Sequence, residues 1–108
     1  MTPKEIFTDQ LPGKLKEKGD EVTKVNAIYQ FDIDGDEGGK WWVDCTKSGG
    51  EVGEGENADA KCTITMASSD FVDMTTGKLN GQMAFMTGKL KIKGDMSLAM
   101  KLGTVLGL

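Results

Sequence analysis

Histidine and arginine are both absent from this chain of 108 residues. Histidine is the side chain most often used as a general base near neutral pH, so the usual acid–base catalyst is missing. A cluster of Cys and His side chains able to hold zinc is missing for the same reason. We therefore expect a protein that is not an enzyme and that carries no metal and no cofactor.

Cysteine is also scarce, because Cys45 and Cys62 are too few for a disulfide framework. Each lies in a run that alternates like a β-strand, which predicts two small buried apolar side chains. No apolar run reaches the length of about 18 residues that a transmembrane helix needs. The N-terminal sequence MTPKEIFTDQ lacks the apolar stretch of a signal peptide. We expect a soluble chain in a reducing, cytoplasmic compartment.

Basic charge does not dominate the composition. Thirteen lysines stand against seventeen acidic residues, which gives a formal net charge of −4. A protein whose main partner is nucleic acid needs a basic surface for the phosphates. We therefore expect no nucleic-acid partner, although a local group of lysines can still meet an anionic headgroup.

The length predicts one domain that spans residues 1–108. A domain of this size buries roughly 65% of the surface of its unfolded chain, which allows one core of modest size. A sizeable internal cavity would therefore use up much of that core.

The N-terminal segment predicts a helix. Thr2 and Glu5 can form a capping box, and apolar residues then recur every four positions as far as Leu15. Pro12 should kink this helix because it removes one backbone hydrogen bond, and Gly19 should end it.

Strands follow. Apolar and polar residues alternate over Val25–Asp32, from Trp41 to Thr46 and from Lys61 to Met66, and Glu51–Gly55 predicts a short edge strand. Gln30 and Asp44 fall on the outward positions of these runs. The inward positions are Val25, Ala27, Tyr29, Phe31, Trp41, Val43, Cys45, Cys62, Ile64 and Met66.

The C-terminal part predicts three helices and one strand. Ser68, Asn80 and Asp95 are expected N-caps, and the last helix should run from Met96 to about Leu106. The strand Lys89–Lys93 alternates strictly, with its three lysines on a face that meets water. Short turns favour antiparallel hairpins, and one apolar sheet face needs a cover of helices. The pattern predicts a two-layer α+β fold.

Methionine is concentrated in this same part, since six of the seven methionines lie between Cys62 and Leu102. Methionine is unbranched and polarizable, so it suits irregular apolar shapes. A plain Met-filled core is one interpretation, and a ligand cavity is the other. The last helix has only a narrow polar stripe of Ser97, Lys101 and Thr104, so it must be covered on two sides by protein, a partner, lipid or a ligand.

Two sequence motifs fail their tests. The run Asp32–Asp36 resembles the start of a calcium loop, but Glu37 and Val43 stand where the loop needs Gly and Glu. A hairpin turn explains it better. Thr-Gly-Lys-Leu occurs at 76–79 and again at 87–90, and leucine replaces the Ser or Thr that a phosphate loop requires. Both are interpreted as helix ends.

An apolar pocket with few polar groups is what remains as a candidate site. Gln82 lies between apolar neighbours just after an expected helix cap. It is either a polar anchor for a ligand or a solvated side chain of a short helix, and the local sequence leaves both open.

The residues also resemble a known family. The segments CTITM at 62–66, SSDF at 68–71, QMAFM at 82–86, GKLKI at 88–92 and MSLAMKL at 96–102 look like the sterol carrier protein 2 domain, also called non-specific lipid-transfer protein. Trp41 to Asp44 fits the Trp-x-x-Asp strand of that family, and the segments occur in family order.

The resemblance implies a five-stranded, mostly antiparallel sheet with helices packed on one face, enclosing an apolar ligand tunnel. It implies non-catalytic binding and transfer of long-chain lipids, namely fatty acids, fatty acyl-CoA, sterols and phospholipids. The positions that it implies as ligand-binding are Trp41, Ile64, Met66, Phe71, Met74, Gln82, Met83, Phe85, Met86, Leu90, Met100 and Leu102.

The chain departs from the family at three places. Gly81 stands where proline is common, Phe85-Met86 replaces a Phe-Phe pair, and the last residues lack the peroxisomal tripeptide of the Ser-Lys-Leu type. We expect a monomer with a long-chain lipid ligand and transient contact with a membrane surface. The alternative is an interaction or accessory domain that docks through an exposed C-terminal helix.

Overall fold

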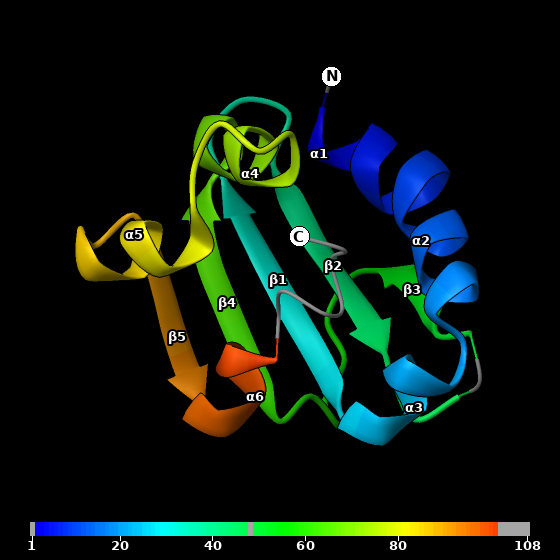
Figure 1. Cartoon of the computed structure of the whole chain (residues 1–108). Helices are drawn as coiled ribbons and strands as arrows, with labels where there is room; N and C mark the ends of the chain where they lie inside the picture. The colour runs from blue at the N-terminus through cyan, green and yellow to red at the C-terminus, as the bar shows by residue number, and fades with distance from the viewer. Residues whose placement is uncertain (1, 48, 102–108) are drawn as a thin grey trace.

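Five strands form one mixed sheet in the computed structural model, which describes residues 2–47 and 49–101 (Figure 1). The strands are β1 (Ile28–Asp34), β2 (Gly39–Asp44), β3 (Glu51–Glu54), β4 (Cys62–Ala67) and β5 (Leu90–Gly94), in the order β3-β2-β1-β4-β5. Only β1 and β4 pair in parallel among these neighbours, and the other three pairs are antiparallel. The predicted five-stranded, mostly antiparallel α+β fold is confirmed.

Helices lie over one face of this sheet (Figure 1). They are α1 (Pro3–Glu5), the π-helical turn η1 (Ile6–Gln10), α2 (Leu11–Lys18), α3 (Asp20–Val25), α4 (Ser68–Thr75), α5 (Gly81–Met86) and α6 (Met96–Met100). In the view of Figure 1, α1 and α2 run beside β2 and β3, α4 lies at the top, and α6 crosses in front of the lower sheet. None of the described helices is long and apolar enough to cross a membrane.

The N-terminal helix differs from the prediction of one kinked helix. Thr2 caps α1 as expected, because its Oγ1 accepts a hydrogen bond of 3.2 Å from the backbone N–H of Glu5. A π-turn then intervenes, and the Leu11 N–H donates to the Ile6 carbonyl five residues back. This turn puts Pro12 in the first turn of α2, where its missing N–H would have no intrahelical partner anyway.

The first strand begins later than predicted. Val25 is buried, but it ends helix α3, and β1 starts at Ile28. Val22 and Val25, three residues apart, are both buried, and Asp20 and Glu21 occupy the first turn. Asn26 then adopts a left-handed φ of 50°, which ends the helix. Val25 is therefore buried because it lies one helical turn after Val22. It fits the strand alternation only because it also stands two residues before the buried Ala27.

The core lies between the helices and the inner face of the sheet. Every predicted inward residue of the three alternating runs is buried. Two outward residues are also buried, which the prediction missed. Gln30 donates to the Gly55 carbonyl (3.0 Å) and accepts from the Asn57 N–H (2.8 Å), so the chain after β3 covers it. Asp44 accepts from the Thr46 backbone N–H at 2.8 Å.

The helix caps of the C-terminal part are partly as predicted. Asn80 Oδ1 accepts from the Met83 N–H at 3.4 Å and Asp95 Oδ1 from the Ser97 N–H at 2.9 Å. Ser68 is not a cap, because α4 starts at Ser68 itself and Ala67 stands at the cap position without a side-chain hydrogen bond. The predicted extension of the last helix to Leu106 lies outside the described residues.

Both cysteines are buried free thiols, as predicted. Burial raises the pKa of the Cys45 thiol from 9.0 to about 12, with a smaller contribution from the charge of Asp44. Burial and then the charge of Asp95 raise the pKa of the Cys62 thiol from 9.0 to about 11. Both thiols therefore stay protonated over the physiological range.

A tight turn requires Gly38. A Cβ atom at this position would lie 2.2 Å from the backbone carbonyl oxygen of Ile33, which cannot move without breaking the β1–β2 hairpin. We expect Gly38→Ala to lower the free energy of unfolding by about 2–3 kcal/mol, measured by urea denaturation. The control is Gly13→Ala in α2, where a Cβ meets nothing within 4 Å. It should raise stability by roughly 0.5–1 kcal/mol, and equal effects of the two would contradict the turn geometry.

The raised thiol pKa values predict a loss of stability in alkali. Above pH 9.0 the unfolded chain releases thiol protons that the folded chain keeps until about pH 11 for Cys62 and 12 for Cys45. The thiol contribution is therefore complete below pH 9 and is lost progressively above it. Denaturation series at increasing pH should show a steeper decline for the natural chain than for Cys45→Ala/Cys62→Ala. Identical slopes would refute the effect.

Candidate functional site

A stack of aromatic rings fills one half of the inner sheet face. Phe7 of η1 lies between Trp41 of β2, with ring centroids 5.2 Å apart, and Phe71 of α4, at 5.0 Å. Both pairs are nearly parallel, and Phe31 of β1 meets Phe7 at a tilt. Such pairs add stabilisation beyond the apolar area that they bury. The stack ties the N-terminal helices, the sheet and α4 together, so this half of the inner face is closed by protein.

Helix α6 lies over the other half of the inner face, and α5 lies beside β5 at the sheet edge (Figure 1). The hydroxyl of Tyr29 on β1 donates a hydrogen bond of 2.5 Å to the backbone carbonyl of Leu98, which holds α6 over the sheet. Burial, and then the neighbouring Cys45, Cys62 and Asp95, raise the pKa of Tyr29 well above its usual value, so the hydroxyl remains a donor. Leu98 of α6 and Ala84 of α5 are buried against this part of the core.

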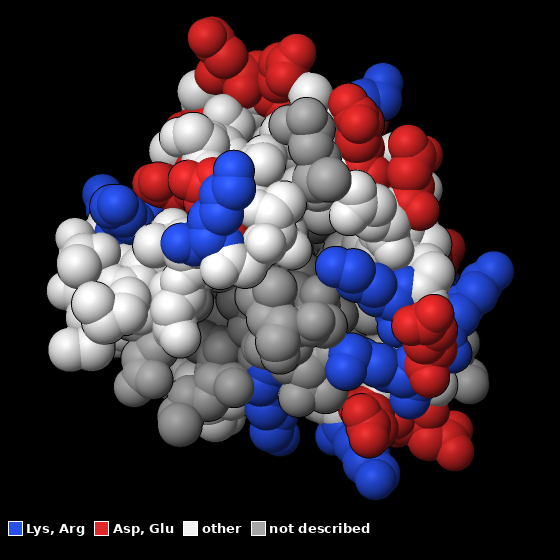
Figure 2. Space-filling view, turned by 45° about the horizontal axis from the view of Figure 1, so that its top comes forward, with Lys and Arg blue, Asp and Glu red and all other residues white. Residues whose placement is uncertain are grey.

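The largest apolar side chains of α5 face solvent. Met83, Phe85 and Met86, which we call the α5 surface, are exposed, with Met86 72% and Phe85 43% accessible. Met96 at the start of α6 is also exposed. Figure 2 shows the α5 region on the left as a white, uncharged surface with lysines along its border. Exposed apolar side chains in a contiguous group mark contact sites for other molecules.

The structure divides the predicted ligand-binding residues into three groups. Trp41 and Phe71 belong to the aromatic stack, and Met74 is buried on α4. Ile64, Met66 and Leu90 are buried on adjacent positions of β4 and β5. Met83, Phe85 and Met86 are exposed rather than turned inward. The side chains of Gln82 and Met100 and all of Leu102 lie outside the described part of the chain.

Sequence reasoning missed Tyr29 as the side chain that fixes α6. It is the only tyrosine of the chain and lies in an apolar strand, where a buried hydroxyl needs a partner. The sequence therefore indicates that the hydroxyl has a hydrogen-bond partner. It does not identify Leu98 as that partner, because Leu98 is 69 residues away.

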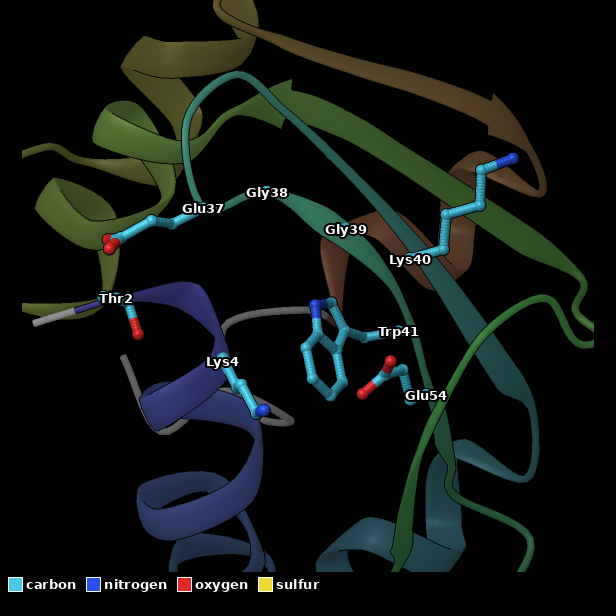
Figure 3. Close-up of a pocket in the computed structure, with 8 residues that line it drawn as sticks. All are labelled: Thr2, Lys4, Glu37, Gly38, Gly39, Lys40, Trp41 and Glu54. Atoms are coloured by element: carbon cyan, nitrogen blue, oxygen red, sulfur yellow. The ribbon is translucent and has the colours of Figure 1, made fainter.

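A pocket of about 320 Å³ opens where α1 approaches the ends of β2 and β3 (Figure 3). Its charged lining residues are Lys4, Glu37, Lys40 and Glu54. Trp41 forms the inner wall and is only 5% exposed, and its indole Nε1 has no hydrogen-bond partner among the described residues. Thr2, Gly38 and Gly39 complete the lining. Within the described residues, no group of three acidic or cysteine side chains is arranged to hold a metal ion.

Known proteins are similar in sequence to this chain. Human sterol carrier protein 2 is 46% identical over 97 residues, which cover 86% of this chain and 18% of that protein. Hydroxysteroid dehydrogenase-like protein 2 of Mus musculus is 52% identical over 85 residues, which cover 77% of this chain and 17% of that protein. The chain thus spans less than a fifth of the length of these two relatives.

Solved structures share the fold. Sterol carrier protein 2 from Yarrowia lipolytica, in its apo form, is 32% identical with a TM-score of 0.73, covering 94% of this chain and 81% of that one. Palmitated SCP2L2 from Aedes aegypti superposes with a TM-score of 0.82 over 100% of this chain and 96% of that one, at 24% identity.

The SCP-2 sterol transfer family matches residues 8–107, which include the end of η1 and every described element from α2 onward. The strand order, the helical cover and the sequence match therefore agree, and this chain belongs to the SCP-2 sterol transfer family.

Proposed function

We propose that this chain binds long-chain lipids and transfers them between membranes without catalysing a reaction. The observation that carries the proposal is the exposed α5 surface beside a buried apolar sheet face, in a member of a family described by sterol transfer. The structural neighbour from Aedes aegypti is described as palmitated, which supports an acyl chain as the ligand. Fatty acids, fatty acyl-CoA, sterols and phospholipids are the proposed classes.

The ligand space is proposed to lie over Ile64, Met66 and Leu90, under α6 and next to α5. The aromatic stack already fills the half of the inner face next to η1, so an acyl chain has less room there. Ile92 of β5, half-buried against the core, extends the same apolar surface. Gln82 and Met100, from α5 and α6, are proposed as the polar anchor and the opposite wall of an apolar tunnel.

Acyl-chain burial would supply the affinity. Burying about twelve methylenes at about 0.8 kcal/mol each gains roughly 10 kcal/mol before ordering costs are subtracted. This gain depends on chain length and hardly on the headgroup. We therefore propose that the protein selects ligands by the length of the acyl chain and accepts several lipid classes.

The dehydrogenase-like name of one relative describes a protein of which this chain matches only 17%. We propose that any catalysis there belongs to other parts of that protein. An accessory role beside a lipid-metabolising enzyme is compatible with lipid binding, and activity would then appear only together with that partner.

The first test is uptake of a fluorescent long-chain fatty acid by the purified chain. Met100→Lys should abolish uptake, because an ammonium group in an apolar ligand space opposes the burial of the acyl chain. Lys101→Gln, at the adjacent exposed residue, is the matched control and should bind normally. Failure of the natural chain to take up any long-chain lipid would contradict the proposed function.

A second candidate role concerns the membrane. The α5 surface is apolar, and the exposed Lys78 and Lys89 stand just before and after α5 in the chain. Apolar side chains bordered by lysines suit an anionic bilayer, which attracts each nearby lysine by about 1 kcal/mol. We propose that this surface touches the bilayer during transfer. The alternative docking through the C-terminal helix concerns Met96 to about Leu106. The structure describes its first part, α6, in which Met96 is exposed and Leu98 is buried, and the part after residue 101 lies outside the described residues.

Phe85→Ser/Met86→Ser should slow lipid transfer between anionic vesicles severalfold, because less apolar area would enter the headgroup region. The equilibrium affinity for free fatty acid should change much less, and raising the salt concentration should slow the natural chain too. Ala58→Ser, an exposed site between β3 and β4, is the control. Unchanged transfer rates in the double variant would exclude this membrane contact.

A further inference from the structure

The outer edge of β5 carries backbone groups that have no partner strand. β5 is the last strand in the sheet order, and β4 pairs with its other side. The Asp95 N–H donates to the Lys61 carbonyl at 3.0 Å. Because bonded pairs alternate in an antiparallel ladder, the backbone groups of Lys91 and Lys93 also face β4. The N–H and C=O of Ile92 therefore point away from the sheet, and no other described segment bonds to them.

The described elements leave this edge open in space. In Figure 1, α5 lies next to the upper end of β5, and no described element lies along the outer side of the strand below it. The Lys89 N–H donates to the Ala84 carbonyl at 2.8 Å, which holds α5 at that upper end. The opposite sheet edge differs, because β3 contacts η1 and α2. The edge that can accept a further strand is therefore that of β5.

The outward side chains of β5 define the charge of a partner. Lys91 and Lys93 are exposed, and neither forms an ion pair among the described residues. Their neighbours on β4 are Thr65 and Thr63, which carry no charge. Alternate residues of a strand lie about 6.8 Å apart, and facing residues of two neighbouring strands about 5 Å apart. Carboxylates on alternate residues of an added strand would therefore lie beside both ammonium groups.

The other face of β5 is apolar. Leu90 is buried and Ile92 is half-buried, next to Met66 and Ile64 of β4 on the inner face of the sheet. Strand side chains alternate between the two faces, so the inward residues of an added strand would cover the exposed part of Ile92. Apolar side chains gain free energy from that burial. The sequence pattern that fits this edge is an alternation of acidic and apolar residues.

We propose that the outer edge of β5 binds an extended acidic peptide of another protein, in which acidic and apolar residues alternate. The peptide adds as a sixth strand, bonds to the backbone of Ile92, and places its carboxylates beside Lys91 and Lys93. A second copy of β5 would bring lysines instead of carboxylates. An anionic bilayer would attract the lysines but offers no row of backbone groups to Ile92. This interaction does not depend on lipid binding.

Amide hydrogen exchange of Ile92 is a direct readout. In the free chain its N–H faces water and should exchange fast, whereas the N–H groups of Lys91 and Lys93 are bonded to β4. The probe is the synthetic peptide Glu-Val-Glu-Val-Glu with blocked ends. It should slow exchange at Ile92 at least about tenfold at saturation and leave Val43, in β2, unchanged. The absence of saturable protection at Ile92 would overturn the proposal.

Charge reversal tests recognition by the side chains. Lys91→Glu/Lys93→Glu alters exposed residues and should weaken this peptide at least about tenfold, because two attractions become repulsions. The variant should instead prefer Lys-Val-Lys-Val-Lys, a switch that loss of folding cannot produce. Lys16→Glu/Lys24→Glu, exposed on α2 and α3, changes the net charge equally and should keep the natural preference. Equal effects of the two double variants would show non-specific attraction and contradict the proposed site.

Methylation of the peptide backbone separates strand addition from simple charge attraction. In an antiparallel pair the residue facing Ile92 is hydrogen-bonded to it and shares its face, so the valine N–H groups face β5. N-methylation of the valines should abolish binding, and N-methylation of the glutamates should leave it nearly unchanged. The reverse pattern would support a parallel strand at the same edge. Tolerance of both modifications would rule out strand addition.

Two other occupants have their own signatures. Self-association in sedimentation, with Ile92 protected in the absence of peptide, would assign the edge to a second copy and overturn the proposal. Protection of Ile92 by phosphatidylserine vesicles but not by the peptide would assign it to a membrane and overturn it as well. A chain that binds the peptide but takes up no fatty acid would contradict only the proposed lipid-binding function.

Discussion

The parallel pairing of β1 with β4 is the contact on which the other parts of this molecule depend. Parallel neighbours usually need a helical crossover, but here the chain between them forms the β2 and β3 strands on the far side of β1. The pairing makes β1 central and gives the inner face two halves. The N-terminal helices and α4 cover one half. The chain after β4 adds β5 to the sheet edge and then places α6 over the other half.

The two halves are stabilised by different means. Flat rings in near-parallel contact fix the half around Phe7, and rings have few rotamers to lose. The other half relies on small or flexible side chains and on the hydrogen bond from the buried Tyr29 hydroxyl to the Leu98 carbonyl. Methionine adapts its shape at little cost, so the α5 surface can fit more than one neighbour. One sheet thus carries a rigid half and an adaptable half.

The strands were predictable because their alternation is local, and the same alternation identified which of their residues face inward. Pro12 and Val25 were misplaced because a π-turn and a short helix depend on contacts beyond their own segments. For the site, alternation identified Ile64, Met66 and Leu90 as inward but cannot distinguish a core from a ligand wall. The exposure of Met86 and the burial of Trp41 result from tertiary packing, which no spacing in the sequence encodes.

Strand β5 is the last in the sheet order, so its outer backbone edge is a template on which another strand could add. Next to it stands the α5 surface, and an apolar patch beside an open strand edge is the arrangement that nucleates aggregation. Lys91 and Lys93, both exposed on this strand, oppose such growth, because each added copy would bring like charges together. The lysines of β5 would thus let this chain carry exposed methionine and phenylalanine at high concentration without forming fibrils.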